Sequence, residues 1–211
     1  MFAFIAREPI LDKSKSVFAY ELIFRDGKGG AYPEHSPEKA QYIEEQFHPL
    51  GLDDISGEKS SFINFSSETL ISRFPTTLDP ASVVVELADN PFTDTGLLEA
   101  CQHIKQLGYR LAIDDPMMLS ARHDILPLID IVKVDVSRTR FETIEKHIPR
   151  YLDANVRLVA EQVNTPDHFA TCSDLGFDLF QGYFFAQPEA RIVRQLPASK
   201  INIVDLMGEV S

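Results

Sequence analysis

The stretch YRLAIDD at residues 109–115 decides the predicted fold. It is a short, mostly apolar run without polar alternation, which is typical of a strand buried on both faces. Apolar residues at helical spacing precede it and end at Gly108, and a second apolar run follows at residues 129–134. Strands that alternate with helices in this way predict parallel βαβ units.

The same alternation extends in both directions along the chain. Further strands are predicted at residues 61–65, 82–87, 157–160 and 177–185, and further helices at residues 36–51 and 165–176. Before them, two β-rich runs at residues 2–6 and 16–24 flank a polar turn, which predicts an antiparallel hairpin.

Eight strand candidates favour an α/β fold of the closed (β/α) TIM-barrel type, with an antiparallel first strand pair. An open doubly wound sheet usually has a glycine-rich phosphate loop near its start, and the sequence has no GxGxxG or GxxxxGK pattern. We expect residues 1–190 to form the barrel domain. Residues 191–211 are amphipathic and are predicted to be a tail or a linker.

Composition narrows the classes of partner. The chain has 211 residues and a formal charge of −12, which disfavours a nucleic-acid polymer or an anionic membrane as partner. No apolar run is long enough to span a bilayer, and the start does not resemble a signal peptide. Cys101 and Cys172 fall on apolar helix faces without a metal-ligand pattern, so we expect reduced core cysteines in a cytoplasmic protein.

Polar residues recur at the carboxyl ends of separate predicted strands. They are Asn64, Glu86, Asp114, Lys133, Glu161 and Gln181. In a barrel these ends surround one mouth, so the side chains are expected to converge. Hard oxygen ligands favour Mg²⁺ or Mn²⁺ over Zn²⁺, and adjacent aspartates such as Asp114 and Asp115 can serve two ions. Any one acid alone would more simply be a helix cap or a loop residue; their joint placement favours a cation site.

These residues lie in motifs that, in this order, resemble the EAL family of bacterial cyclic di-GMP phosphodiesterases. The motifs are RLAIDD, IVKVD, LVAEQVN and LGFDLFQGYFFAQP, and the similarity extends from Arg7 to Pro188. The signature tripeptide reads Glu21-Leu22-Ile23 here and is followed by Arg25. The YELIFRDG form and the C-terminal segment resemble the subgroup in which an EAL domain precedes an HDOD domain.

The resemblance implies a role for each matching residue. One metal ion would be bound by Glu21, Asn64, Glu86 and Asp114, and a second by Asp114, Asp115 and Glu161. Lys133 would position or deprotonate the attacking water, with Glu161 and Gln181 at the catalytic centre, and Arg25 would face a substrate phosphate. The implied reaction is hydrolysis of cyclic di-GMP to pGpG with two Mg²⁺ or Mn²⁺ ions. An HDOD or other regulatory domain and a second copy of the chain are the implied partners.

Two departures from the family pattern leave alternatives open. The family's DDFGTG loop reads DDPMML here, so proline replaces a residue at a loop that must move. Asn164 replaces the second glutamate of the family's EGVE stretch, which steadies that loop. The alternatives are a module that binds cyclic di-GMP without turnover, and a scaffold that acts through protein contacts alone.

Overall fold

The computed structural model describes residues 2–25, 52–65, 67–72, 78–87, 95–114 and 125–194. The helix predicted at residues 36–51, Asp115 and the DDPMML loop lie outside these ranges. The strands are β1 (Phe2–Asp12), β2 (Val17–Arg25), β3 (Ser60–Phe65), β4 (Val83–Leu87), β5 (Arg110–Asp114), β6 (Ile131–Asp135), β7 (Arg157–Glu161), β8 (Leu179–Phe180) and β9 (Glu189–Arg194). The helices are α2 (Leu52–Ser56), α3 (Ser67–Ser72), α4 (Thr95–Gln106), the 3₁₀ turn η1 (Leu126–Leu128), α6 (Phe141–Asp153) and α7 (Pro166–Asp174).

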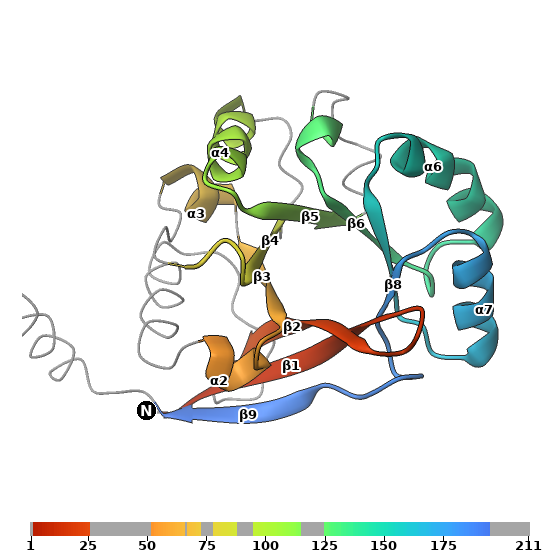
Figure 1. Cartoon of the computed structure of the whole chain (residues 1–211), viewed down its shortest axis with the longest axis horizontal. Helices are drawn as coiled ribbons and strands as arrows, with labels where there is room; N and C mark the ends of the chain where they lie inside the picture. The colour runs from red at the N-terminus through yellow and green to blue at the C-terminus, as the bar shows by residue number, and fades with distance from the viewer. Residues whose placement is uncertain are drawn as a thin grey trace, which may run out of the picture.

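Eight strands close into a barrel with helices on its outside (Figure 1). Strands β2 to β8 are parallel neighbours in chain order. β1 closes the ring because it is antiparallel to β2 on one edge and to β8 on the other. The predicted barrel with an antiparallel first strand pair is therefore confirmed.

The first strand continues well beyond its predicted end. It was expected at residues 2–6 but extends through Pro9 to Asp12, where the predicted turn begins. Pro9 is tolerated because residues 8–10 pair with β2 on one edge, while on the other edge β9 pairs up to Arg7 and β8 from Leu11. A strand residue without an N–H group is accommodated where an edge is locally unpaired.

The chain after the barrel adds one more strand. β9 pairs antiparallel with the first half of β1, from Phe2 to Arg7, and Figure 1 shows the two side by side. The predicted boundary between residues 190 and 191 falls within this strand. β8 is also shorter than predicted, with two residues instead of the apolar run at 177–185.

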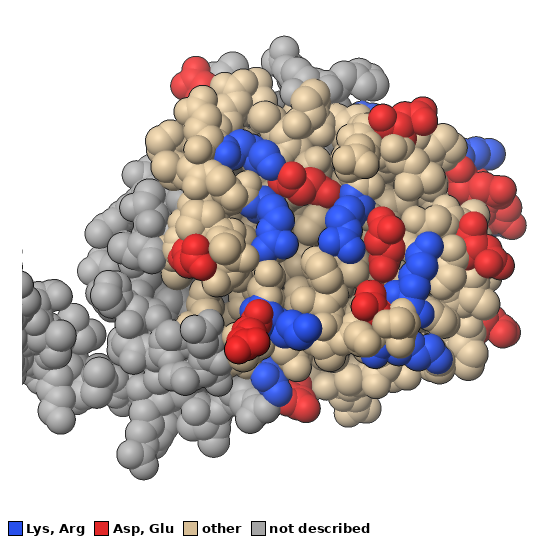
Figure 2. All heavy atoms as spheres, viewed as in Figure 1, with Lys and Arg blue, Asp and Glu red and all other residues tan. Residues whose placement is uncertain are grey.

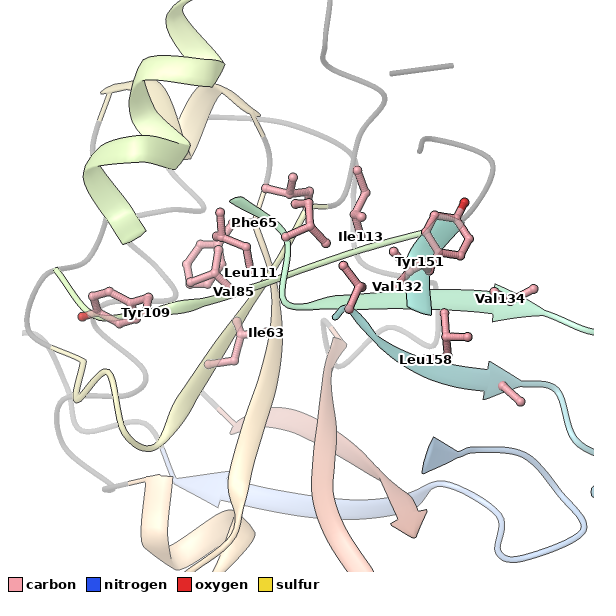
Figure 3. Packing of buried hydrophobic residues seen from close by; sticks show 14 of the residues in the cluster. Ile63, Phe65, Val85, Tyr109, Leu111, Ile113, Val132, Val134, Tyr151 and Leu158 are labelled. Atoms are coloured by element: carbon pink, nitrogen blue, oxygen red, sulfur yellow. The ribbon is translucent and has the colours of Figure 1, made fainter. Parts of the chain in front are cut away.

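The core has two layers. The larger layer lies between the outward faces of the strands and the helices, where Ile63, Val85, Leu111 and Val132 pack together (Figure 3). The smaller layer fills the inside of the barrel with one buried residue from each strand of the ring. Its members are Ile10, Ala19, Phe62, Val84, Ala112, Ile131, Val159 and Leu179. Apolar burial on both sides explains why the strands lack polar alternation.

Both cysteines belong to the core, as predicted. Cys101 on α4 and Cys172 on α7 are 0% exposed. Burial raises the pKa of each thiol to about 12. We expect no reaction of the native protein with a thiol reagent at pH 8 and modification of both thiols after unfolding in urea, because only the thiolate reacts. Rapid labelling without denaturant, measured by absorbance or mass spectrometry, would contradict this burial.

The surface carries charges of both signs. Basic and acidic side chains alternate across the face shown in Figure 2, although the whole chain has a formal charge of −12. In the part of the chain that the structure describes, no helix combines the length and the apolar character needed to cross a bilayer.

Candidate functional site

A layer of polar side chains lies directly above the apolar layer inside the barrel. Because side chains alternate along a strand, the residue two positions beyond each apolar member faces the same interior. β1 runs in the opposite direction, so its member comes two positions earlier. This polar layer has one residue for each strand of the ring: Glu8, Glu21, Asn64, Glu86, Asp114, Lys133, Glu161 and Gln181. Glu8 and Glu21 lie within the long strands β1 and β2, and Gln181 follows the last residue of β8. It lies at the end of the barrel where active sites of this fold are found.

Lys133 occupies the centre of the polar layer. Its Nζ lies 3.2 Å from Glu21 Oε2, 2.7 Å from Glu86 Oε1 and 2.8 Å from Glu161 Oε1. The side chain is 1% exposed. Burial opposes its charge, but the three carboxylates outweigh burial and raise the pKa of Lys133 well above its usual value. Lys133 is therefore an ammonium ion.

Glu21 is held by donors on three sides. Besides Lys133, the Gln181 side chain donates from Nε2 to Glu21 Oε2 at 2.7 Å, and Asn64 donates from Nδ2 to Oε1 at 3.3 Å. Burial raises the pKa of Glu21, but Lys133 and the two amides overcome it and leave the pKa below the usual value. Glu21 is consequently an ionised carboxylate fixed in direction.

Glu86 and Glu161 are less well compensated. Burial and the neighbouring carboxylates raise the pKa of both, although each also contacts Lys133. Among the residues that the structure describes, Glu86 Oε2 and Gln181 Oε1 find no hydrogen-bond partner, and both residues are 4% exposed. Buried acceptors without a donor are unfavourable, so this layer has capacity for a further positive group.

The donor set fits divalent cations of the hard type. Five of the eight residues are carboxylates, one is an ammonium, and two are amides. Oxygen ligands without histidine or cysteine match Mg²⁺ or Mn²⁺. Within the described ranges, no three acidic side chains surround an ion position as they stand, because the Lys133 ammonium lies between them. A cation would thus share its carboxylates with Lys133.

The structure brings together most of the residues predicted for the site. Seven of them belong to the polar layer: Glu21, Asn64, Glu86, Asp114, Lys133, Glu161 and Gln181. Asp115 lies outside the described residues. Arg25 ends β2 and its backbone pairs with Phe4, and the structure does not describe its side chain.

Sequence reasoning missed Glu8. It is 8% exposed and is the direct cross-strand partner of Glu21. Glu8 lies two positions before the buried Ile10, so both face the barrel interior. This could be predicted only by assuming that the first strand continues through Pro9.

The ends of β7 and β8 are joined tightly at the mouth. Gln162 has a left-handed φ of 57°, which turns the chain immediately after Glu161. Val163 then donates its N–H to the Gln181 carbonyl at 2.9 Å, and Phe184 donates to the Val163 carbonyl at 3.1 Å. Gly182 lies between these bonds. The backbone that carries Glu161 and Gln181 is therefore one connected unit.

A closed barrel with an acidic polar layer at its carboxyl-terminal mouth defines a barrel protein with a candidate cation-dependent active site. The chain belongs to the EAL domain family, whose sequence model matches residues 45–188. The matched residues include Asn64, Glu86, Lys133 and Glu161. They begin after Glu8 and Glu21.

Two curated relatives match nearly the whole chain. The cyclic di-GMP phosphodiesterase CdgJ of Vibrio cholerae is 35% identical over 98% of this chain and 49% of the relative's length. The uncharacterized protein YuxH of Bacillus subtilis is 28% identical over 100% of this chain and 53% of the relative. The chain thus spans about half the length of these relatives.

Solved structures share the fold. BlrP1 of Klebsiella pneumoniae, in a calcium and cyclic di-GMP complex, has a TM-score of 0.71 and 20% identity over 89% of this chain and 56% of that protein. A standalone EAL protein of Vibrio cholerae O395, bound to cyclic di-GMP, has a TM-score of 0.64 and 20% identity over 87% of this chain and 91% of that protein.

Proposed function

We propose that this domain hydrolyses one phosphodiester bond of cyclic di-GMP to give linear pGpG, with two divalent cations, Mg²⁺ or Mn²⁺. The observation that carries the proposal is the convergence of Glu21, Glu86 and Glu161 on the buried Lys133 at the barrel mouth. The relative named a cyclic di-GMP phosphodiesterase and the EAL structures determined with cyclic di-GMP support this substrate.

The proposed cation ligands follow the polar layer. Glu21, Asn64, Glu86 and Asp114 would hold one ion, and Asp114, Asp115 and Glu161 the other. When bound, such ions supply positive charge that polarises a phosphate and lowers the pKa of water. Four of these residues already lie on adjacent strands, with Asn64 beside Glu86 as a cross-strand pair.

Side chains of the domain would perform the other roles in hydrolysis. Water adds to phosphorus, the bond to the 3′ oxygen breaks, and that oxygen takes up a proton. Because Lys133 is an ammonium, it donates a hydrogen bond and positions water or a phosphate oxygen rather than accepting a proton. Glu161, which contacts Lys133 at 2.8 Å, would lie at the catalytic centre as a cation ligand beside that water. Gln181 fixes Glu21, and Arg25 would bind a phosphate.

A second candidate is a receptor that binds cyclic di-GMP without turnover. Asn164 stands where the resemblance implies a glutamate. Its Oδ1 accepts the N–H of Tyr183 at 3.2 Å, on the turn after Gln181. That contact engages Asn164 with the β8 end of the mouth, and the loss of the glutamate favours binding without turnover.

We further propose the setting in which the domain works. The domain predicted at residues 1–190 would include all of β9, to Arg194. The rest of the predicted segment 191–211 would lead toward an HDOD or other regulatory domain if the chain is part of a longer protein. The curated relatives are about twice as long as the match, which leaves room for such a domain in them. A cytoplasmic location and a homodimer complete the proposal.

Incubation of the purified protein with cyclic di-GMP and Mn²⁺ tests the reaction directly. We expect pGpG by chromatography, and loss of product when EDTA removes the metal. Calorimetry with the dinucleotide separates the two candidates. Heat without product would favour the receptor, while neither heat nor product would contradict both.

Glu86→Gln is expected to separate activity from stability. Hydrolysis should fall at least about 100-fold, because a cation ligand is lost. The cation-free variant should be equally stable or more stable by about 1 kcal/mol, because a poorly compensated buried charge is removed. Urea unfolding measures the second effect. Glu145→Gln, on the exposed face of α6, is the matched control and should change neither property. A Glu86→Gln variant that is strongly destabilised without metal would contradict the assignment.

A further inference from the structure

Glu8 is a buried carboxylate in the polar layer to which neither the sequence motifs nor the matched family region assigns a role. It faces the barrel interior from β1, opposite Glu21, and is 8% exposed. A glutamate is rarely buried without a charged partner, since desolvation disfavours its ionised form. A neutral or apolar residue would serve the fold alone better at this position.

The contacts of Glu8 connect it to the cation site. The Gln181 side chain donates to Glu21 Oε2 at 2.7 Å, and Glu21 is the cross-strand neighbour of Glu8. Burial raises the pKa of Glu8, and the nearby Glu21 raises it further, whereas Gln181 and Lys133 oppose this rise. Two carboxylates of like charge are thus neighbours on β1 and β2, and the Lys133 ammonium contacts Glu21 at 3.2 Å.

The described part of the polar layer carries an excess of negative charge. The polar layer holds four more carboxylates than ammonium groups. Within the described residues, two buried acceptors of the same layer, Glu86 Oε2 and Gln181 Oε1, have no hydrogen-bond partner. The Gln181 oxygen does not belong to the carboxylate count, and both acceptors point to a bound positive group as the missing partner.

We propose that Glu8 is a further residue of the cation site, whose carboxylate strengthens divalent-cation binding through its charge. This inference rests on the proposed function, because it concerns the same cations. It implies that a charge from the antiparallel strand β1 contributes to a site otherwise built from the parallel strands.

The test is Mn²⁺ binding to the whole chain without nucleotide, measured by calorimetry and by the shift of the unfolding temperature. Glu8→Gln retains the size and hydrogen-bonding groups of the side chain but removes its charge. We expect Mn²⁺ affinity to fall on the order of tenfold, because a unit charge near a divalent ion in a partly buried site is weakly screened. The Mn²⁺-induced rise in unfolding temperature should shrink in parallel. Glu145→Gln changes the net charge equally at a remote exposed position and should bind as the wild type does.

The outcomes distinguish this inference from the proposed reaction. Equal Mn²⁺ affinity in Glu8→Gln and wild type would overturn the role of Glu8, whatever the hydrolysis assay shows. If the wild type binds Mn²⁺ without forming pGpG, the proposed reaction is wrong, and the affinity ratio still decides on Glu8. If the wild type does not bind Mn²⁺ at millimolar concentration, the cation site and the role of Glu8 are both wrong.

Discussion

Lys133→Met is expected to destabilise the cation-free protein by about 3–5 kcal/mol at pH 7, because it leaves buried carboxylates without their common partner. Lys133 Nζ lies within 3.2 Å of an oxygen of each of Glu21, Glu86 and Glu161. Urea unfolding followed by circular dichroism measures the effect, since the chain has no tryptophan to report on unfolding. Hydrolysis should also be lost.

The destabilisation by Lys133→Met should depend on pH in a defined direction. Burial already raises the pKa of Glu86 and Glu161, and loss of the ammonium raises both pKa values further. A carboxyl with a raised folded-state pKa lowers stability above that pKa, and the penalty disappears below the unfolded value of about 4.3. The difference from the wild type should therefore shrink between pH 7 and pH 5.

Lys105→Met provides the matched control for Lys133. Lys105 also contacts a carboxylate, with Nζ at 2.6 Å from Asp130 Oδ2, but the two side chains are 27% and 33% exposed. A partly exposed pair of this kind contributes about 1 kcal/mol or less. Equal losses in the two variants, or a pH-independent loss at Lys133, would show that charge compensation is not its role.

Gly182→Ala should cause the other large effect, a loss of about 3–5 kcal/mol in the free energy of unfolding. Gly182 has a φ of 145°, and a Cβ there would lie 2.4 Å from the Val163 nitrogen and 2.6 Å from its carbonyl oxygen. Backbone atoms cannot rotate away as a side chain can. Relief of the clash must separate the β7 and β8 ends, so the surviving folded protein should also lose activity.

Gly57→Ala distinguishes this clash from the general effect of a positive φ. Gly57 has a φ of 62°, and no atom of the described residues lies within 4 Å of the position of an added Cβ. We expect a loss of only about 1–2 kcal/mol there, from backbone strain alone. A similar small loss at Gly182, with activity retained, would mean that the two strand ends are not rigidly joined.

The sequence was sufficient to predict most of the barrel because its strands are apolar on both faces. Short apolar runs such as residues 129–134 are typical of strands buried on both faces. The polar residues at their carboxyl ends indicated the mouth of the barrel. Helix α6 and strand β9 were not predicted from the sequence. Helix α6 contains Pro149, yet it buries Ile144, Ile148 and Tyr151 against the barrel. β9 depends on an edge of β1 that exists only after the barrel closes.

The candidate site was predictable where a motif accompanied each residue, and Glu8 was missed because none did. A position in the polar layer depends on register, and register here depends on the continuation of β1 through a proline. The directions of the pKa shifts also could not be predicted from sequence, because they arise from Lys133 lying between three carboxylates from different strands.

The pairing of β1 has a consequence for how the chain can fold. Of the strands in this sheet, β1 is synthesised first, whereas its partners on one edge, β8 and β9, are synthesised last. Leu11 pairs with Phe180, and Phe2 pairs with Arg194. Contacts between such distant residues form slowly, because a long loop must close first. A chain still being translated therefore keeps open sheet edges, which can pair with other chains. The edges of the barrel strands are paired within the same chain only after β8 has been synthesised and has paired with β1.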